Sequence, residues 1–250
     1  MESLSTAFNR VDVANGQPIP EVAHPFYRLK TARLLKVHKR ILTLSRPTLS
    51  ARYGEEEADR IILESAERFR LLIPALPFVG SMLTNCFEYE IVGAVMALAL
   101  YQAIRAKGED RERAGELMVR VWEGTFAAMN QRLLRWAGWL YFRRPTWWLL
   151  RLFALRSQWR MHPGDFVFSF VPGDGKSFDF GVDFHECAIG KLLDEIGWSE
   201  FHEILCAVDF PMSDVMGTGL VRERTLARGD ACCTFRLCAG RPVRRGWPLA

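Results

Sequence analysis

The sequence predicts an α+β fold, in which an N-terminal helical bundle is followed by a ββ-helices-ββ antiparallel sheet module. Two observations predict it: apolar residues recur at helical spacing from Pro25 to about Arg160, and phenylalanines alternate with other residues after Pro163. With 250 residues, of which 49% are hydrophobic, the chain is long enough to bury a substantial core. The order of the two patterns fits a four-stranded antiparallel sheet that carries helices on one face.

The same patterns divide the chain into four regions. Residues 1–22 are expected to form an irregular arm, and residues 23–162 the helical region. Residues 163–240 form the α+β module, which holds five of the six cysteines, and residues 241–250 form a C-terminal tail.

Helical periodicity and helix-stop residues define the segments of the helical region. Pro74 and Pro77 are expected to end the second segment, and Gly108 follows the third. Pro145 opens the last segment, since proline is tolerated in a first helical turn. The third segment is rich in Ala and Leu and is expected to be buried nearly all round. The predicted helices span residues 27–41, 55–73, 91–106, 112–139 and 145–160.

Turn residues separate the elements of the α+β module. The Pro172–Gly175 segment predicts a turn between two strands, and Gly197 ends the helix that follows. Ser199 is a suitable N-cap for the next helix, which Pro211 interrupts. A turn at residues 228–230 separates the last two strands. The predicted strands span residues 166–170, 178–184, 220–227 and 232–238, and the first helix of the module spans residues 187–196.

Charge and hydropathy limit the classes of partner. The net charge of +4 is mild and argues against a nucleic-acid partner, and the basic stretch 28–40 is interpreted as a solvated helix face. The N-terminus lacks the apolar core of a secretory signal, and the apolar stretches are too short or too interrupted to cross a membrane, so we expect a cytoplasmic protein that acts on a small molecule. The apolar helices 91–104 and 136–159 make a homodimer plausible.

The Trp- and Arg-rich helix at residues 147–160 has two interpretations. It is either a buried helix whose arginines extend to solvent, which we favour, or a helix that lies against a membrane surface or a partner.

Three cysteines and one aspartate are the chemically informative residues. His202, Cys206 and Asp209 are separated by four and then three residues, which places them on one face of a helix. A thiol beside an imidazole and a carboxylate is the arrangement of an activated thiolate nucleophile. Without a signal peptide a disulfide framework is not expected, so thiol chemistry, metal binding and core packing all remain open.

The topology predicts that distant thiols converge. Cys187 lies where a strand meets a helix, Cys206 and Asp209 close the next helix, and Cys233 lies on the final strand. A compact module brings these places to one end of the sheet. Three thiols and a carboxylate suit zinc as well as catalysis, although the chain has no CxxC pair and the thiol separations match no standard zinc pattern. No cofactor is required by the sequence, and zinc bound by Cys187, Cys206 and Cys233 remains an option.

The motifs of the module resemble a known family. Phe184-His185-Glu186-Cys187 is followed by Leu205-Cys206-Ala207-Val208-Asp209, then by Arg224-Thr225-Leu226-Ala227, and finally by Gly229 and Cys233-Thr234-Phe235. This order resembles the bacterial L-2-amino-thiazoline-4-carboxylic acid hydrolase family over residues 178–237. The chain departs from it at Thr234, where many members carry aspartate. The layout is also similar to vinyl-reductase-type ligand-binding domains, some of which hold zinc, so a zinc-stabilised binding module without catalysis is the alternative.

The resemblance implies a hydrolase that opens a five-membered cyclic amidine at a C–N or C–S bond and yields a carbamoyl-cysteine. It implies Cys206 or Cys187 as the nucleophile and Asp209 as the partner of the substrate amidinium. His185 is then the nearest candidate base, and Cys233 a supporting thiol or metal ligand. Arg224 and Glu88 are the candidate substrate-binding residues, Arg224 for a substrate carboxylate.

Overall fold

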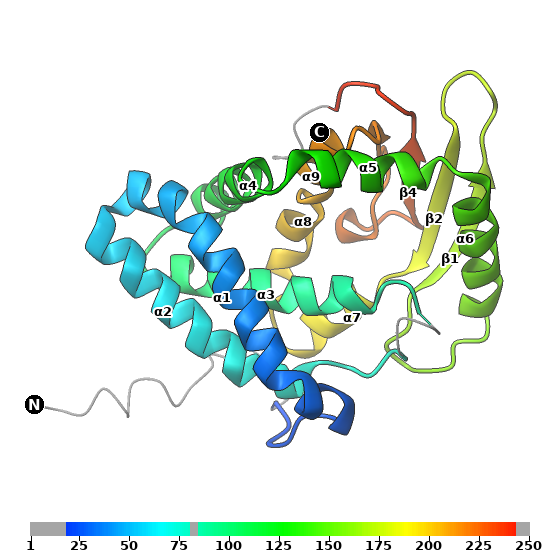
Figure 1. Cartoon of the computed structure of the whole chain (residues 1–250). Coiled ribbons are helices and arrows are strands. Elements are labelled where there is room, and N and C mark those ends of the chain that lie inside the picture. Colours follow the sequence, from blue (N-terminus) through cyan, green and yellow to red (C-terminus); the bar gives the residue numbers. More distant parts are fainter. Residues whose placement is uncertain (1–18, 81–84, 244–250) are drawn as a thin grey trace, which may run out of the picture.

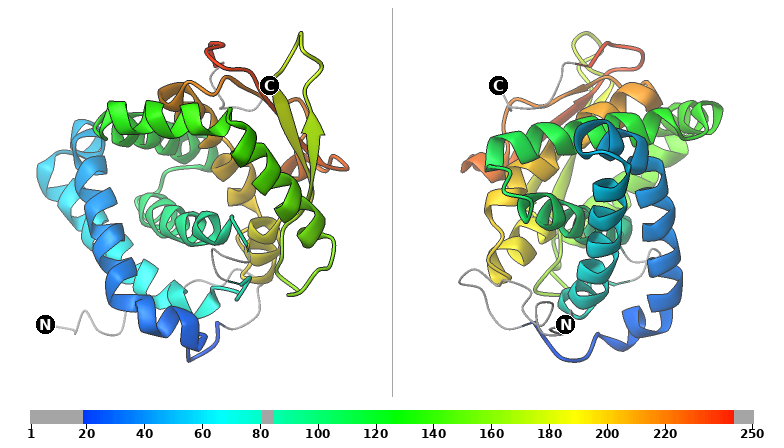
Figure 2. Two further views of the ribbon diagram at one scale, coloured as in Figure 1. Left: turned by 45° about the vertical axis from the view of Figure 1, so that its right-hand side comes forward. Right: turned by 90° about the vertical axis from the view of Figure 1, so that its left-hand side faces the viewer.

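The computed structural model describes residues 19–80 and 85–243, so most of the predicted arm 1–22 and tail 241–250 lies outside the described residues. One central helix organises the helical region. Helix α3 runs through the middle of a ring formed by the other helices, as Figure 1 and the left view of Figure 2 show, and it packs against α2, α4, α7 and α8. The helices of this region are α1 (Pro25–Tyr53), α2 (Glu55–Leu72), α3 (Glu88–Arg105), α4 (Arg111–Ala127), α5 (Gln131–Tyr141) and α6 (Arg144–Ser157).

Local signals set the helix boundaries. Gly54 adopts a φ of +83° between α1 and α2, a conformation that glycine reaches without strain. Asp110 caps α4 by accepting a hydrogen bond from the Arg113 backbone N–H at 2.8 Å. The prediction of one helix over residues 112–139 is wrong, because α4 ends at Ala127 and Asn130 caps a new helix, accepting from the Leu133 N–H at 3.2 Å.

The C-terminal module contains the predicted four-stranded antiparallel sheet. The strands β1 (Val167–Pro172), β2 (Phe180–Glu186), β3 (Leu220–Val221) and β4 (Cys233–Leu237) lie in the order β1-β2-β4-β3. The helices α7 (Ala188–Glu195), α8 (Glu200–Cys206) and α9 (Asp209–Met216) connect β2 to β3. The α+β fold class predicted from the sequence is confirmed.

Alternation along the strands separates an apolar from a polar sheet face. Phe184 of β2 lies opposite Phe168 and Cys233 and packs in the core, whereas Asp183, one residue earlier, pairs with Arg236 at 2.6 Å. Helices cover the apolar face, as predicted.

The strand predicted over residues 220–227 is wrong beyond Val221. Side-chain hydrogen bonds replace the ladder there: Asp230 Oδ2 accepts from the Thr225 N–H at 2.8 Å, and Thr225 Oγ1 accepts from the Ala227 N–H at 3.4 Å. Such local bonds offer the backbone an alternative to sheet pairing, and residues 226–228 form a short 3₁₀ turn.

One hydrophobic core joins the two regions. Tyr101 of α3 stacks on Phe201 of α8 with ring centroids 4.6 Å apart, and both side chains are fully buried. Burial of each such large apolar side chain contributes about 1.5–3 kcal/mol. No helix within the described residues is both long and apolar enough to cross a membrane.

The contact between α5 and α9 gives a prediction. A Cβ on Gly138 would lie 2.0 Å from the backbone oxygen of Met216, whereas a Cβ on Gly93 of α3 would meet no atom within 4 Å. We expect Gly138→Ala to lower the free energy of unfolding by about 1–3 kcal/mol because two backbones must separate. The matched Gly93→Ala should raise it by about 0.5–1 kcal/mol through helix propensity. Urea unfolding measures both, and equal effects would contradict the proposed packing.

Candidate functional site

Helix α3 carries one accessible stripe on an otherwise buried surface. Glu90 and Gly93 are exposed and Ala97 is half-buried, at a spacing of three and four residues that places them on one face. The flanking Ile91 and Val92 and most of the residues from Ala94 to Ile104 are buried. A Cβ on Gly93 would meet no atom within 4 Å, so this stripe borders an open hollow beside α3.

Arg222 and Asp209 form an ion pair at the start of α9, in which the arginine is buried and the aspartate half-buried. Arg222 Nη1 donates to Asp209 Oδ2 at 2.6 Å, and Arg222 Nη2 donates to the carbonyl oxygen of Cys206 at 2.7 Å. The Arg222 side chain is only 2% exposed. Its guanidinium lies 4.9 Å from the ring centroid of Phe210 and 5.2 Å from that of Phe235. The arginine thus fixes both the carboxylate that begins α9 and the end of α8.

Two carboxyl groups, Glu90 and Asp209, interact inside the protein. Burial and, more weakly, the charge of Asp209 together raise the pKa of Glu90 to about 7. Burial also raises the pKa of Asp209, while Arg222 opposes that rise by its charge and its hydrogen bond. Glu90 therefore keeps solvent-accessible surface and is nevertheless desolvated, as expected for a group that lines a hollow. A carboxyl group with a pKa near 7 can both accept and donate a proton at neutral pH.

Tyr141, the last residue of α5, lies close enough to Glu90 and Asp209 to interact with them electrostatically. Burial raises the pKa of its hydroxyl to about 12, with further contributions from Glu90, Cys86 and Asp209. The phenol therefore stays protonated near neutral pH and is able to donate a hydrogen bond toward the carboxyl groups.

The structure brings together the three thiols that the sequence singled out. Thr225 Oγ1 donates to Cys206 Sγ at 3.9 Å and lies 3.5 Å from Cys233 Sγ. Cys187 caps α7, and its sulfur accepts from the Gly190 N–H at 3.4 Å. Charge on Cys233 would raise the pKa of Cys187, so these sulfurs lie close enough to interact electrostatically.

The surroundings of Cys187 and Cys206 keep these two thiols protonated. Burial raises the pKa of Cys187 to about 11 despite the Gly190 N–H. Burial also raises the pKa of Cys206 strongly; Arg222 opposes this rise, and Asp209, Cys187 and Cys233 add to it. Neither thiol is a ready nucleophile at neutral pH in the unliganded protein. Within residues 19–80 and 85–243, no group of three His, Cys, Asp or Glu side chains is arranged to hold a metal ion.

Three of the sequence-predicted residues lie elsewhere. His185 is exposed on the polar sheet face, with its Nε2 2.9 Å from Ser169 Oγ. Arg224 is also exposed, and its backbone N–H donates to Thr234 Oγ1 at 3.1 Å. Glu88 is buried and accepts a hydrogen bond from Lys30 Nζ at 2.8 Å. The structure does not bring these side chains to the thiols.

Among the described residues, the imidazole of His202 forms no hydrogen bond to Cys206 or Asp209. A Cβ on Gly190 would lie 2.6 Å from the imidazole of His202, so the ring packs directly on α7. Burial lowers the pKa of His202, and its Nε2 is buried without a hydrogen-bond partner among the described residues. The helical spacing that pointed to His202, Cys206 and Asp209 thus gave one neighbouring pair, Cys206 and Asp209.

Sequence reasoning missed Glu90, Tyr141 and Arg222. Glu90 carried a signal: it is the last charged residue before an apolar helix, and small residues follow it at helical spacing. Arg222 carried none, because arginines at 222 and 224 look equivalent in an extended segment.

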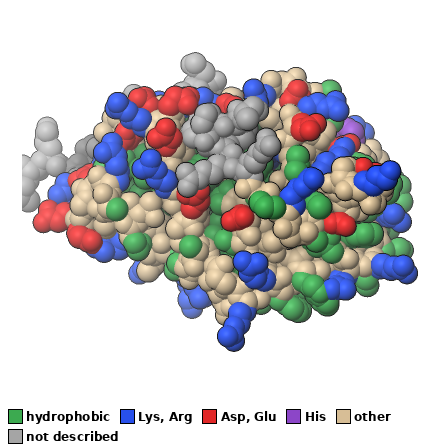
Figure 3. Space-filling view, turned by 90° about the horizontal axis from the view of Figure 1, so that it is seen from above, with side chains coloured by type: hydrophobic (Ala, Val, Ile, Leu, Met, Phe, Trp, Pro, Cys, Tyr) green, Lys and Arg blue, Asp and Glu red, His purple; other side chains and the backbone are tan. Residues whose placement is uncertain are grey.

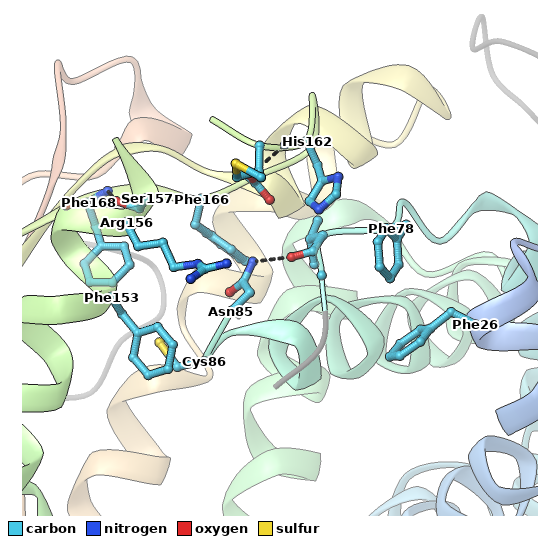
Figure 4. A pocket seen from close by; sticks show the side chains of 14 residues that line it. Phe26, Phe78, Asn85, Cys86, Phe153, Arg156, Ser157, His162, Phe166 and Phe168 are labelled. Carbon is cyan, nitrogen blue, oxygen red and sulfur yellow. Dashed lines mark hydrogen bonds between the residues drawn. The ribbon is translucent and has the colours of Figure 1, made fainter. Parts of the chain in front are cut away.

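An aromatic cavity of about 330 Å³ adjoins the cluster at Cys86. Phe26 and Phe78 lie at one end of it, and Phe153 and Cys86 at the other, as Figure 4 shows. The pKa of Cys86 rises to about 12 through burial and, more weakly, through the charge of Glu90. Arg156 also lines the cavity and gives it a cationic group.

The fold and the site define a class: an α+β protein whose helical core and sheet enclose paired carboxyl groups and thiols beside a hollow. A family model described as L-2-amino-thiazoline-4-carboxylic acid hydrolase matches residues 88–237, which is more than half of the chain. The chain belongs to this family, as the sequence resemblance predicted. The match includes Glu90, Asp209 and Arg222. No curated protein and no solved structure matches the chain.

The buried ion pair gives a second prediction. Arg222→Met leaves the Asp209 carboxylate without its cation, and we expect a loss of about 3 kcal/mol in the free energy of unfolding at pH 8. The loss should become smaller as the pH falls, because burial raises the pKa of the Asp209 carboxyl group and, without the arginine that opposes this rise, the group takes up a proton more readily. Urea unfolding of Arg222→Met and of the exposed control Arg224→Met measures the effect. Similar losses for the two variants would contradict the assignment of Arg222 as the buried partner.

Proposed function

We propose that this chain is a hydrolase that opens a small five-membered cyclic amidine of the 2-aminothiazoline-4-carboxylate type. The observation that carries the proposal is the pair of desolvated, interacting carboxyl groups, Glu90 and Asp209, in a member of this family. A protonated amidine is a planar cation, and carboxylates bind such cations by paired, charge-assisted hydrogen bonds. The zinc-stabilised binding module is less favoured, because the described residues offer no three-ligand cluster.

In the proposed complex, Asp209 holds the substrate amidinium. Arg222 keeps this carboxylate oriented and partly ionised in a desolvated place, so the cation meets a positioned negative charge. Arg156, on the wall of the adjoining cavity, is the candidate partner of the substrate carboxylate in place of the exposed Arg224.

The proposed step is addition of water to the carbon between sulfur and nitrogen. Ionised Glu90 accepts a proton from the water as its oxygen bonds to this carbon, and the tetrahedral intermediate then collapses with cleavage of the C–S bond. The sulfur leaves and takes the proton from Glu90, while the hydroxyl of the intermediate loses its proton to solvent as the C=O bond forms. The amidinium and water thus give a urea group, a thiol and one released proton, as in formation of a carbamoyl-cysteine. Cleavage of the C–S bond is favoured because a thiolate is a better leaving group than an amide nitrogen.

The thiols support water rather than cysteine as the nucleophile. The raised pKa values of Cys187 and Cys206 leave little thiolate at neutral pH. In this proposal the sulfur atoms line the site next to Asp209 without forming a bond to the substrate. They are those of Cys187, Cys206 and Cys233. Attack by Cys206 is the competing mechanism, and it requires a covalent adduct that the water mechanism does not form.

Substitutions separate the two mechanisms. We expect Asp209→Asn and Glu90→Gln each to lower kcat/KM by about 10²–10⁴-fold, the range that a general acid–base group contributes. Cys206→Ser should lower kcat/KM less than about tenfold, because the serine side chain fills nearly the same space in the site and no bond to the sulfur is needed. Turnover of 2-aminothiazoline-4-carboxylate, followed by the new thiol, measures all three, with the exposed Glu116→Gln as the matched carboxyl control. A loss of activity in Cys206→Ser equal to that in Asp209→Asn, together with a trapped adduct, would replace water with Cys206.

The pKa of Glu90 predicts a pH dependence. Because Glu90 must be ionised to accept a proton, kcat/KM should rise with pH through about 7 and this limb should vanish in Glu90→Gln. Stability should change in the opposite direction. The folded pKa of Glu90 lies above its ordinary value of 4.5, so the folded state binds more protons and loses stability as pH rises from about 4.5 to about 7.

Urea unfolding between pH 4 and pH 8 provides the independent measurement. The loss of stability with rising pH should be smaller in Glu90→Gln than in the wild type, while Glu116→Gln should follow the wild type. An unchanged pH dependence in Glu90→Gln would show that Glu90 is not desolvated in the folded protein.

A further inference from the structure

The outer face of α6 carries an apolar stripe that the fold leaves uncovered. Trp148, Leu152, Leu155 and Trp159 are separated by four, three and four residues, so they follow one side of the helix and its last turn. Their exposed fractions are 68%, 47%, 70% and 68%. The opposite side of α6 packs on the sheet: Ala154 is buried, and Trp147 and Leu150 pack against the buried side chains of Phe180, Phe210, Leu220 and Leu237. The helix thus buries one apolar side against the sheet and exposes a second apolar side to solvent.

Arginines surround the stripe without acidic neighbours in sequence. Residues 124–164 contain seven arginines and no Asp or Glu. Among the described residues, Arg160 is paired with Glu186 at 2.7 Å, whereas Arg144 and Arg151 form no ion pair and are exposed. On the face seen from above in Figure 3, apolar side chains lie between Lys and Arg side chains in the lower right of the view.

The charge pattern selects among the possible occupants of this face. A symmetric dimer through the stripe would bring the same arginines of two copies together, which Coulomb repulsion opposes in an interface of low polarity. An anionic lipid surface provides the complement, because its headgroups pair with arginine and its acyl boundary accepts Trp and Leu. Tryptophan in particular favours the membrane–water interface.

We propose that α6 docks the protein on the surface of an anionic lipid bilayer, with Trp148, Leu152, Leu155 and Trp159 in the headgroup–acyl boundary. Arg144 then contacts lipid phosphates, and Arg151, whose guanidinium lies 4.7 Å from the ring centroid of Phe170, adds to the positive charge of this face. The adjacent side of the same helix carries Phe153 and Arg156, which line the aromatic cavity, so docking places this cavity beside the lipid interface (Figure 4). The proposal is independent of the hydrolase function, since the stripe contains none of the carboxyl groups or thiols of the proposed catalytic site.

Vesicle co-sedimentation of the full chain tests the proposal. We expect binding to vesicles of phosphatidylcholine with about 30% phosphatidylglycerol, weak binding to phosphatidylcholine alone, and a decrease in binding with added salt. Trp148→Ser/Trp159→Ser and Arg144→Glu/Arg151→Glu should each weaken binding at least about tenfold. The matched control Leu29→Ser/Leu63→Ser removes two equally exposed leucines from α1 and α2 and should bind as the wild type does.

Several outcomes would overturn the proposal. They are absence of wild-type binding to the anionic vesicles, equal binding by the stripe and control variants, and a soluble dimer that Trp148→Ser/Trp159→Ser converts to a monomer. Thermal unfolding confirms that each variant is folded. If a stripe variant proves unfolded, a blue shift of tryptophan fluorescence in the wild type on addition of anionic vesicles, compared with Trp148→Phe and Trp159→Phe, decides the same question.

Discussion

The buried guanidinium of Arg222 is the interaction on which the site depends. It bonds the Asp209 carboxylate and the carbonyl of Cys206, and it lies against the rings of Phe210 and Phe235. A single side chain thus connects the end of α8, the start of α9 and strand β4. Without a cation there, a desolvated carboxylate at position 209 would take up a proton or lose its place. The arginine makes a charged anchor possible inside the protein.

The helical region supplies the second acid and the space beside it. Most of helix α3 is buried by its neighbours, but Glu90 and Gly93 are exposed and Ala97 is half-buried, and the two small residues leave room there. The same helix therefore packs in the core on most of its surface and borders open space at Gly93. The same desolvation that raises the pKa of Glu90 keeps the nearby thiols protonated, so the environment favours carboxyl chemistry over thiolate chemistry.

The surface of α6 is distinct from this interior. Its inner side packs on β1, and its outer side presents apolar residues among arginines such as Arg144, which forms no ion pair with any described residue. The favoured sequence interpretation, a buried helix with arginines reaching solvent, describes only the inner side. The outer side supports the second interpretation, in which the helix lies against a membrane surface or a partner. Its exposed arginines are complementary to an anionic lipid surface.

The sequence by itself determined the α+β class, the four antiparallel strands and the convergence of Cys187, Cys206 and Cys233, because these follow from periodicity and from the compactness of the module. Only the tertiary structure decided which charged residues face the interior. Glu88 and Glu90 are two residues apart on a helix, about 200° around its axis, so one pairs with Lys30 and the other lines the hollow. Arg222 and Arg224 share a strand-like spacing, but the chain leaves the sheet after Val221, and the backbone path then buries one and exposes the other.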